Sequence, residues 1–168
     1  AMDTPFIYDR YVTGKNFIGR KAECGIVRNL LERNADICMY GPPKSGKMSV
    51  IQQAVFDMRM SGQQFMTVVV SLYNVRTLEA FLTKFGTAVI RPLASTPAEY
   101  EEIVDSWLAG THFVFDPDRF SSKDEIVSLN WEPDDNDILQ MMRLPSAAAA
   151  GKGMPLYVIL EEFQNIMM

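Results

Sequence analysis

The chain has 168 residues, 48% of them hydrophobic and 22% charged, with a formal net charge of −5 at pH 7. This composition is ordinary for a globular domain, and the acidic balance argues against a chain built mainly to bind nucleic acid. Two cysteines, Cys24 and Cys38, are too few for a disulfide framework, and Cys38 lies in an apolar run where we expect core packing. A signal-peptide pattern and a long apolar run are both absent, so these features predict a cytoplasmic location.

The first elements alternate between helix and strand. Apolar residues at helical spacing predict a helix over 21–33, and a short apolar strand follows at 37–40. A second helix is predicted over 47–60, ended by Gly62. The expected apolar face of this helix consists of Val50, Ile51, Ala54, Val55 and Met58.

The middle of the chain continues this alternation. Residues 65–72 are β-branched and almost continuously apolar, which predicts a strand buried on both faces, as parallel sheets require. A helix is expected over 75–92. Thr96 and Glu99 then form a capping box around Pro97, and the helix that they open should end before Gly110.

Residues 111–133 leave two interpretations open. The segments 112–115 and 126–131 are either short strands or parts of an ordered loop with aromatic anchors. A helix is predicted over 134–151, bent or restarted at Pro145, and a buried strand over 156–160. The alternation of apolar strands and helices predicts an α/β fold with a parallel sheet and helices on both faces.

One stretch between the first strand and the second helix carries a chemical pattern. It has the spacing G-x-x-x-x-G-K of a phosphate-binding loop, with a strand before it and a helix after it. Backbone N–H groups of such a loop and the N-terminus of the following helix bind phosphate. The predicted phosphate-binding residues are Gly41, Pro42, Pro43, Lys44, Ser45, Gly46, Lys47, Met48 and Ser49.

A second pattern follows the last predicted strand, which ends in Glu161 and Glu162. Ligands of open α/β sheets bind at the carboxyl ends of the strands, so these acids should lie beside the phosphate-binding loop. We assign Glu161 to Mg²⁺ binding and Glu162 to the role of general base toward an attacking water.

The two patterns, together with Phe17-Ile18-Gly19-Arg20, resemble the AAA-type ATPases called archaeal-type, of the STAND group of signalling NTPases. The resemblance implies ATP as the nucleotide, an adenine pocket near Phe17 and Ile18, and Mg²⁺ as a second cofactor. It also implies a three-layer αβα P-loop NTPase core with a parallel sheet, incomplete at its C-terminus. Residues 5–168 would form this single domain, with the lid and the C-terminal domains absent.

The resemblance implies that the chain acts as a nucleotide-dependent switch within a longer protein. The expected partners are the nucleotide and, through the absent domains, either another protein or a second copy of the chain. Neither a membrane nor nucleic acid is indicated by this segment. ATP hydrolysis is expected to be weak or absent in the isolated chain.

Two positions depart from the family pattern. Met48 stands where a Ser or Thr normally binds Mg²⁺, and a thioether is a poor ligand for this hard cation. Ser49 lies about 100° further around the helix and does not replace it. Glu161 stands where the family commonly has Asp. An alternative interpretation is therefore a degenerate P-loop module that serves as a protein-interaction platform without hydrolysis.

The remaining polar residues suggest little chemistry. His112 is expected to be structural, since no nucleophile pattern accompanies it. Asp134, Asp135 and Asp137 show no metal-ligand spacing, and we expect them to be solvated residues at a helix start. A small-molecule kinase is disfavoured, because the segment 63–96 offers only Arg76 and Arg91 for a substrate lid.

Overall fold

The computed structural model describes residues 27, 29–31, 36–39 and 47–161 of the chain. Within them lies a three-stranded sheet in the order β1-β5-β2, formed by β1 (Ile37–Met39), β5 (Leu156–Glu161) and β2 (Met66–Ser71). Both pairs of strands are parallel, with Met39 opposite Leu160 and Ser71 opposite Glu161. The predicted α/β class with a parallel sheet is therefore confirmed for this part of the chain.

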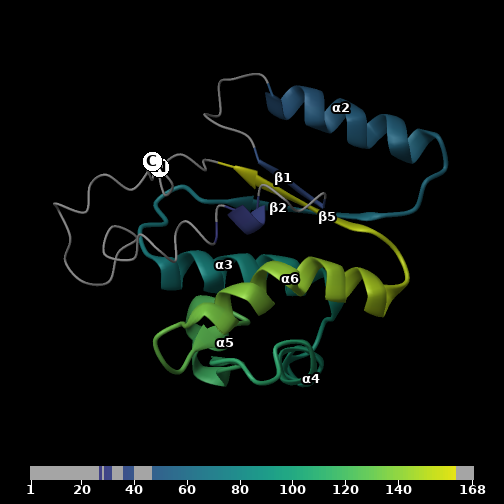
Figure 1. Ribbon diagram of the computed structural model, residues 1–168. Helices are drawn as coiled ribbons and strands as arrows, with labels where there is room; N and C mark the ends of the chain where they lie inside the picture. The colour runs from purple at the N-terminus through teal and green to yellow at the C-terminus, as the bar shows by residue number, and fades with distance from the viewer. Residues whose placement is uncertain (1–26, 28, 32–35, 40–46, 162–168) are drawn as a thin grey trace, which may run out of the picture.

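Helices lie on both sides of this sheet (Figure 1). On one side are α3 (Leu78–Ile90) and α6 (Asp135–Lys152), and on the other is α2 (Lys47–Met60). The predicted bounds of α2 are confirmed, and those of α3 and α6 agree within three residues at each end. Pro145 lies inside α6, which continues past it as one helix.

The two faces of the sheet differ in burial. Val68 and Val70 point toward α3 and α6 and are 8% and 1% exposed, whereas Val69 between them is 50% exposed. The prediction that this strand is buried on both faces is thus wrong. The same holds for Cys38, which was expected in the core but is exposed. Both side chains belong to the face of the sheet on which α2 lies.

Helix α2 is mostly exposed over the residues whose burial is described, 50–60. Val50, on its predicted apolar face, is 70% exposed, and Phe56 and Met60 are 56% and 71% exposed. Ile51, Val55 and Met58 of the predicted face are half-buried, whereas Val50 and Ala54 are exposed, so the expected burial of that face is found only in part. Helix α3, by contrast, has buried residues along its whole length, from Leu78 to Ile90.

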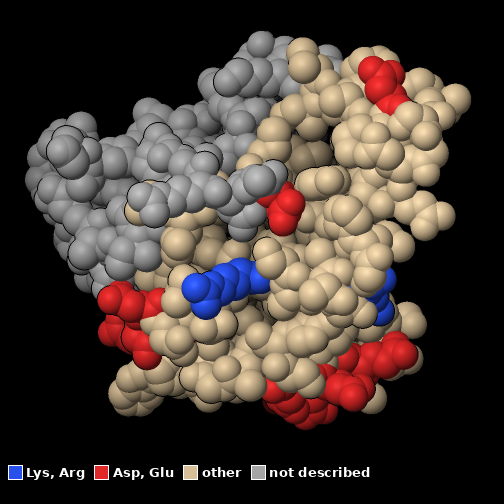
Figure 2. Space-filling view, turned by 45° about the vertical axis from the view of Figure 1, so that its right-hand side comes forward, with Lys and Arg blue, Asp and Glu red and all other residues tan. Residues whose placement is uncertain are grey.

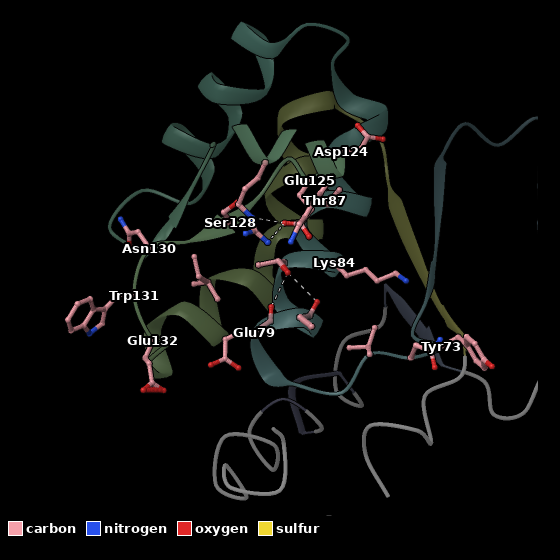
Figure 3. Close-up of a pocket in the computed structure, with 17 residues that line it drawn as sticks. Tyr73, Glu79, Lys84, Thr87, Asp124, Glu125, Ser128, Asn130, Trp131 and Glu132 are labelled. Carbon is pink, nitrogen blue, oxygen red and sulfur yellow. Dashed lines mark hydrogen bonds and ion pairs between the residues drawn. The ribbon is translucent and has the colours of Figure 1, made fainter. Parts of the chain in front are cut away.

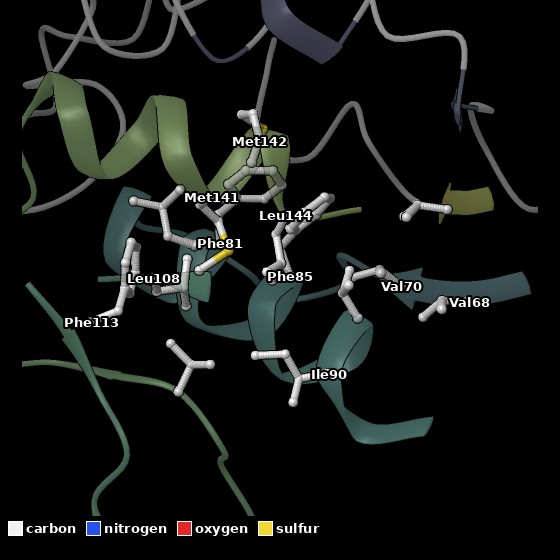
Figure 4. Packing of buried hydrophobic residues seen from close by; sticks show 14 of the residues in the cluster. Val68, Val70, Phe81, Phe85, Ile90, Leu108, Phe113, Met141, Met142 and Leu144 are labelled. Carbon is white, nitrogen blue, oxygen red and sulfur yellow. The ribbon is translucent and has the colours of Figure 1, made fainter. Parts of the chain in front are cut away.

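The main core lies between α3, α6 and the sheet (Figure 4). Phe81 and Phe85 of α3 and Met141 of α6 are fully buried there. Gly86 permits the close approach of the two helices, since a Cβ at this position would lie 2.7 Å from Cε of Met141. Apolar burial of this extent is the main stabilising contribution to such a fold.

The remaining elements form a lobe below α3. The 3₁₀-helix η4 (Arg91–Leu93) is followed by α4 (Pro97–Trp107), and α4 begins with the predicted capping box, with both hydrogen bonds present. The segment left open by the sequence contains β3 (Phe113–Val114) and β4 (Ser128–Leu129), paired antiparallel, so the interpretation as short strands holds. Between them lies α5 (Pro117–Lys123), which was not predicted.

The charge of this lobe is mostly negative. Helix α4 carries exposed carboxylates at Glu99, Glu101, Glu102 and Asp105. In Figure 2 acidic side chains gather along the lower edge of the visible face, at the level where Figure 1 places α4. None of the helices in the described part of the chain has the length and apolarity that crossing a membrane requires.

The helix-to-helix core should dominate stability. Replacing Phe81→Ala removes a fully buried ring and leaves a cavity, so we expect a loss of about 3–5 kcal/mol in the free energy of unfolding. Urea denaturation followed by circular dichroism measures this change. Phe56→Ala is the matched control, because its ring is 56% exposed, and it should cost less than about 1 kcal/mol. Equal losses for both variants would contradict the described core.

Candidate functional site

The described residues that flank the predicted nucleotide site lie at one edge of the parallel sheet. Strands β1, β5 and β2 all end at this edge, because they run parallel and in register. The chain leaves β1 after Met39 and enters α2 at Lys47. The strand that precedes the predicted loop and the strand that ends in Glu161 are thus direct neighbours, and α2 starts from the same connection.

Glu161 is held at this edge by backbone pairing. Its carbonyl accepts a hydrogen bond of 2.8 Å from the N–H of Leu72, and its register partner on β2 is Ser71. The residue is half-buried. A carboxylate is therefore fixed at the carboxyl ends of the strands, where open α/β sheets bind their ligands.

Most other residues of the predicted site lie outside the described residues. These are Phe17, Ile18, Gly41, Pro42, Pro43, Lys44, Ser45, Gly46 and Glu162. Lys47, Met48 and Ser49 form the first three positions of α2. The positive end of a helix dipole thus starts at Lys47, as an anion site at a helix N-terminus requires.

The donor set fits a phosphate better than it fits Mg²⁺. Met48, the second residue of α2, offers a soft thioether where this hard cation needs an oxygen. Glu161 is the single carboxylate of the predicted pair within the described residues. Phosphate binding through N–H groups and Lys47 does not need that oxygen. We therefore derive no metal-dependent step for this site.

Sequence reasoning missed Ser71 and Tyr73, which lie at the same edge. Ser71 stands opposite Glu161, and Tyr73 follows it by two residues with 62% of its surface exposed. Asn74 next to Tyr73 has φ 65°, the left-handed turn by which the chain leaves β2 toward α3. A polar residue directly after the run Val68–Val70 is the signal that would have found Ser71.

A second cluster of ionisable groups lies at the start of α6. His112, Asp134 and Asp137 each offer a potential metal-ligand atom, all within 4.8 Å of one another. Asp137 is fully buried, so its predicted solvated state is wrong, although its place in the first helical turn is as expected. The two aspartates form a capping box that closes the N-terminus of α6.

The hydrogen bonds of Asp137 explain its burial. Its Oδ1 accepts from the backbone N–H of His112 at 2.8 Å. Its Oδ2 lies 2.8 Å from Nδ1 of His112 and accepts from the N–H of Asp134 at 2.9 Å. Because an ionised carboxylate only accepts, Nδ1 is the donor of that pair. Both oxygens are engaged, so the cluster ties β3 to α6 and agrees with a structural role for His112.

The protonation of the pair follows from this geometry. The hydrogen bond to Asp137 raises the pKa of His112, and the nearby charges of Asp137 and Asp134 raise it further against partial desolvation. Burial by itself raises the pKa of Asp137, but the hydrogen bonds from His112 and Asp134 outweigh it and hold that pKa below its ordinary value. Both shifts favour the charged form of each group, an imidazolium beside a carboxylate.

Comparisons of the chain with family models, with curated proteins and with solved structures give no match. The resemblance to AAA-type ATPases therefore depends on the motifs of the chain itself.

The imidazolium–carboxylate pair predicts a pH-dependent stability. The folded pKa of His112 is raised, so its contribution is fully present below about pH 6.5, the ordinary value, and is lost as pH rises through the folded pKa. Thermal unfolding should show the melting temperature of the parent falling over this range relative to His112→Gln. Asp135→Asn, an exposed neighbour, is the control and should keep the parent's pH profile. A parallel pH profile for His112→Gln would contradict the pair.

Proposed function

We propose that this chain is an ATP-binding P-loop domain of the AAA/STAND type that acts as a nucleotide-dependent switch. The phosphates would lie at the edge of the sheet where β1 ends and α2 begins. Lys47 would pair with the terminal phosphates, and the backbone N–H groups within residues 43–48, all but that of Pro43, which has none, would donate hydrogen bonds to them as a nest. The adenine pocket near Phe17 and Ile18 remains part of the proposal from family resemblance.

One observation carries this proposal. Strands β1 and β5 pair directly and in parallel, with Met39 opposite Leu160. The strand before the G-x-x-x-x-G-K motif and the strand ending in Glu161 thus reach the same edge, although they are separated by more than a hundred residues. The arrangement supports an anion site at α2 with an acidic strand end beside it, the pattern that phosphoryl-binding folds use.

The hydrolytic part of the proposal depends on Mg²⁺ and on a general base. Glu162 would act as the general base in an intact protein, and Glu161 would hold Mg²⁺. Met48 favours a second candidate, in which the domain binds nucleotide statically and serves as a protein-interaction platform. The two candidates share nucleotide binding and differ in the use of Mg²⁺.

Removal of the motif lysine tests nucleotide binding. Lys47→Ala deletes a charged hydrogen bond to phosphate, worth about 1.5–3 kcal/mol, so we expect ATP affinity to fall about 10- to 100-fold. Isothermal titration with ATP measures the change. Lys152→Ala, an exposed lysine at the end of α6, should leave the affinity unaltered. Absence of binding by the parent at millimolar ATP would sink the proposal.

Restoration of the hydroxyl ligand separates the two candidates. Met48→Thr supplies an oxygen for Mg²⁺, so ATP should bind about tenfold more tightly with Mg²⁺ than with a chelator, while the parent shows little difference. Titrations of both proteins under the two conditions measure this, and Met58→Thr, further along α2, is the matched control. A parent already as Mg²⁺-dependent as Met48→Thr would refute the static candidate.

A further inference from the structure

Strand β2 is an outer strand of the sheet. In the order β1-β5-β2 it pairs with β5 on one side, and no described strand pairs with its other, free side. It has six residues, whereas β1, the outer strand opposite, has three. The free side of an outer strand presents N–H and C=O groups that can pair with another chain. In the described sheet, the free side of β2 is thus the longer surface that can accept a further strand.

The backbone groups on the free side of β2 follow from its pairing with β5. The N–H of Met66 donates to the carbonyl of Pro155 at 2.8 Å, and the N–H of Leu72 donates to the carbonyl of Glu161 at 2.8 Å. Even-numbered residues therefore bond to β5, because successive residues of a strand point their N–H and C=O groups to opposite sides. The residues of β2 whose N–H and C=O groups point to the free side are Thr67, Val69 and Ser71.

The free side of β2 lacks the features that normally keep outer strands from pairing. The stretch 60–75 contains no Asp, Glu, Lys, Arg or Pro, although 22% of the chain is charged. Charged side chains, prolines and β-bulges are the usual protections, and β2 pairs with β5 in an unbroken register. Val69, near the centre of the strand, is 50% exposed. Uncharged segments of this kind, rich in β-branched residues, readily pair with a second chain.

The sequence around Val69 has the same chemical order in both directions. Residues at equal distances on its two sides match as valines, hydroxyls, aliphatics, aromatics and amides. These matched residues are Val68 with Val70, Thr67 with Ser71, Met66 with Leu72, Phe65 with Tyr73, and Gln64 with Asn74. Antiparallel pairing of two β2 strands about a twofold axis at Val69 places each residue opposite its match. A strand of another sequence would not use this symmetry, so the pattern favours a second copy as the partner.

The backbone and the side chains agree on this register. Val69 would lie opposite Val69 of the second copy, and Thr67 opposite Ser71. All three residues point their N–H and C=O groups to the free side, so each pair exchanges two hydrogen bonds, as in an antiparallel ladder. Hydroxyl pairs of this kind stabilise neighbouring strands. An axis at Val70 would keep the hydrogen bonds but place Ser71 opposite Val69, and the chemical match would be lost.

One charged side chain beside the start of β2 is compatible with the antiparallel direction. Arg59 of α2 donates to the carbonyl of Phe65 at 3.3 Å and lies 4.3 Å from the centroid of its ring. In an antiparallel pair the two copies of Arg59 stand at opposite ends of the ladder, so they do not repel each other. Each lies toward Tyr73 of the second copy, which is 62% exposed. Figure 3 shows Tyr73 at one end of the surface groove beside α3, away from Trp131.

We propose that two copies of this chain associate through the free sides of β2, which pair antiparallel about Val69. The two three-stranded sheets then form one continuous sheet. A twofold axis perpendicular to this sheet keeps α2 of both copies on one face and α3 and α6 of both copies on the other. The proposal goes beyond nucleotide binding and does not depend on it.

Charged residues at the axis test the pairing. Val69→Lys places two like charges opposite each other, so association should weaken at least about tenfold, and Val69→Glu should have the same effect. Sedimentation velocity over a concentration series from micromolar to millimolar protein measures the monomer–dimer equilibrium. Val50→Lys, at a residue of α2 that is 70% exposed, is the matched control and should associate as the parent does. A parent that stays monomeric over the whole series, or a Val69→Lys protein that associates as the parent does, would overturn the proposal.

A mixture of the two charged variants tests the register. Because Val69 meets only itself across the axis, Val69→Lys and Val69→Glu should form a mixed dimer although neither associates with itself. Native mass spectrometry identifies that dimer by its mass. If the mixture stays monomeric while both variants keep the melting curve of the parent, the axis at Val69 is wrong.

A second pair of variants keeps the test decisive if a charge at the axis prevents folding. Thr67→Glu and Ser71→Lys change residues that face each other between the two copies. Mixed together, they should associate about tenfold more tightly than either variant alone, since one Glu then lies opposite one Lys. Circular dichroism melts show which variants keep the fold. Equal association of the mixture and of the separate variants would contradict the proposed register.

Discussion

Strand β5 lies between β1 and β2, and the other features of the molecule depend on this parallel pairing. The backbone of β5 bonds to both neighbours, from Leu156 opposite Met66 to Glu161 opposite Ser71. Parallel strands need crossover connections, and here the crossovers carry the helices that cover the sheet. The same register brings three strand ends to one edge. The described residues that flank the candidate nucleotide site lie at that edge.

The sheet has one well-covered face, and this asymmetry divides the molecule. On the face of α3 and α6, close helix packing at Gly86 and Met141 gives a dense core. On the face of α2, Val69 and Cys38 remain exposed. Helix α2, which follows the predicted phosphate-binding motif, lies on the less covered side, and the lobe of α4 and α5 lies on the other. In the proposed switch domain, this asymmetry would combine a firm core with a less tightly held α2, since local stability varies across a fold.

Features set by neighbouring residues could be predicted from the sequence. Thr96 and Glu99 meet within one helical turn, so their capping box was predicted correctly. The strand before the motif and the start of α2 follow from local hydrophobicity and glycine spacing. Burial was harder to predict, because it depends on what covers a face. The run Val68–Val70 specifies a strand, but it does not reveal that Val69 lacks a cover.

Features assembled from distant segments could not be predicted. Asp137 was expected in solvent because its partner His112 lies 25 positions away in the chain. The surface groove beside α3 joins Tyr73 from the β2–α3 connection, Lys84 from α3 itself and Trp131 from the segment after β4. No local sequence pattern predicts such contacts between distant segments. A single aromatic residue that is exposed in the structure cannot be told from a core residue in the sequence. The candidate nucleotide site could be proposed from the sequence because its motif is nearly continuous, and most of its residues lie outside the described part of the chain.

Hydrogen exchange with and without ATP tests the central claim most directly, because it reports where a ligand acts. Binding at the sheet edge should slow exchange in peptides covering residues 37–50 and 156–161, and leave α4 at residues 97–107 unchanged. Lys47→Ala should abolish that protection under the same conditions. Unchanged exchange at the sheet edge with saturating ATP, or protection confined to the lobe of α4 and α5, would contradict the account.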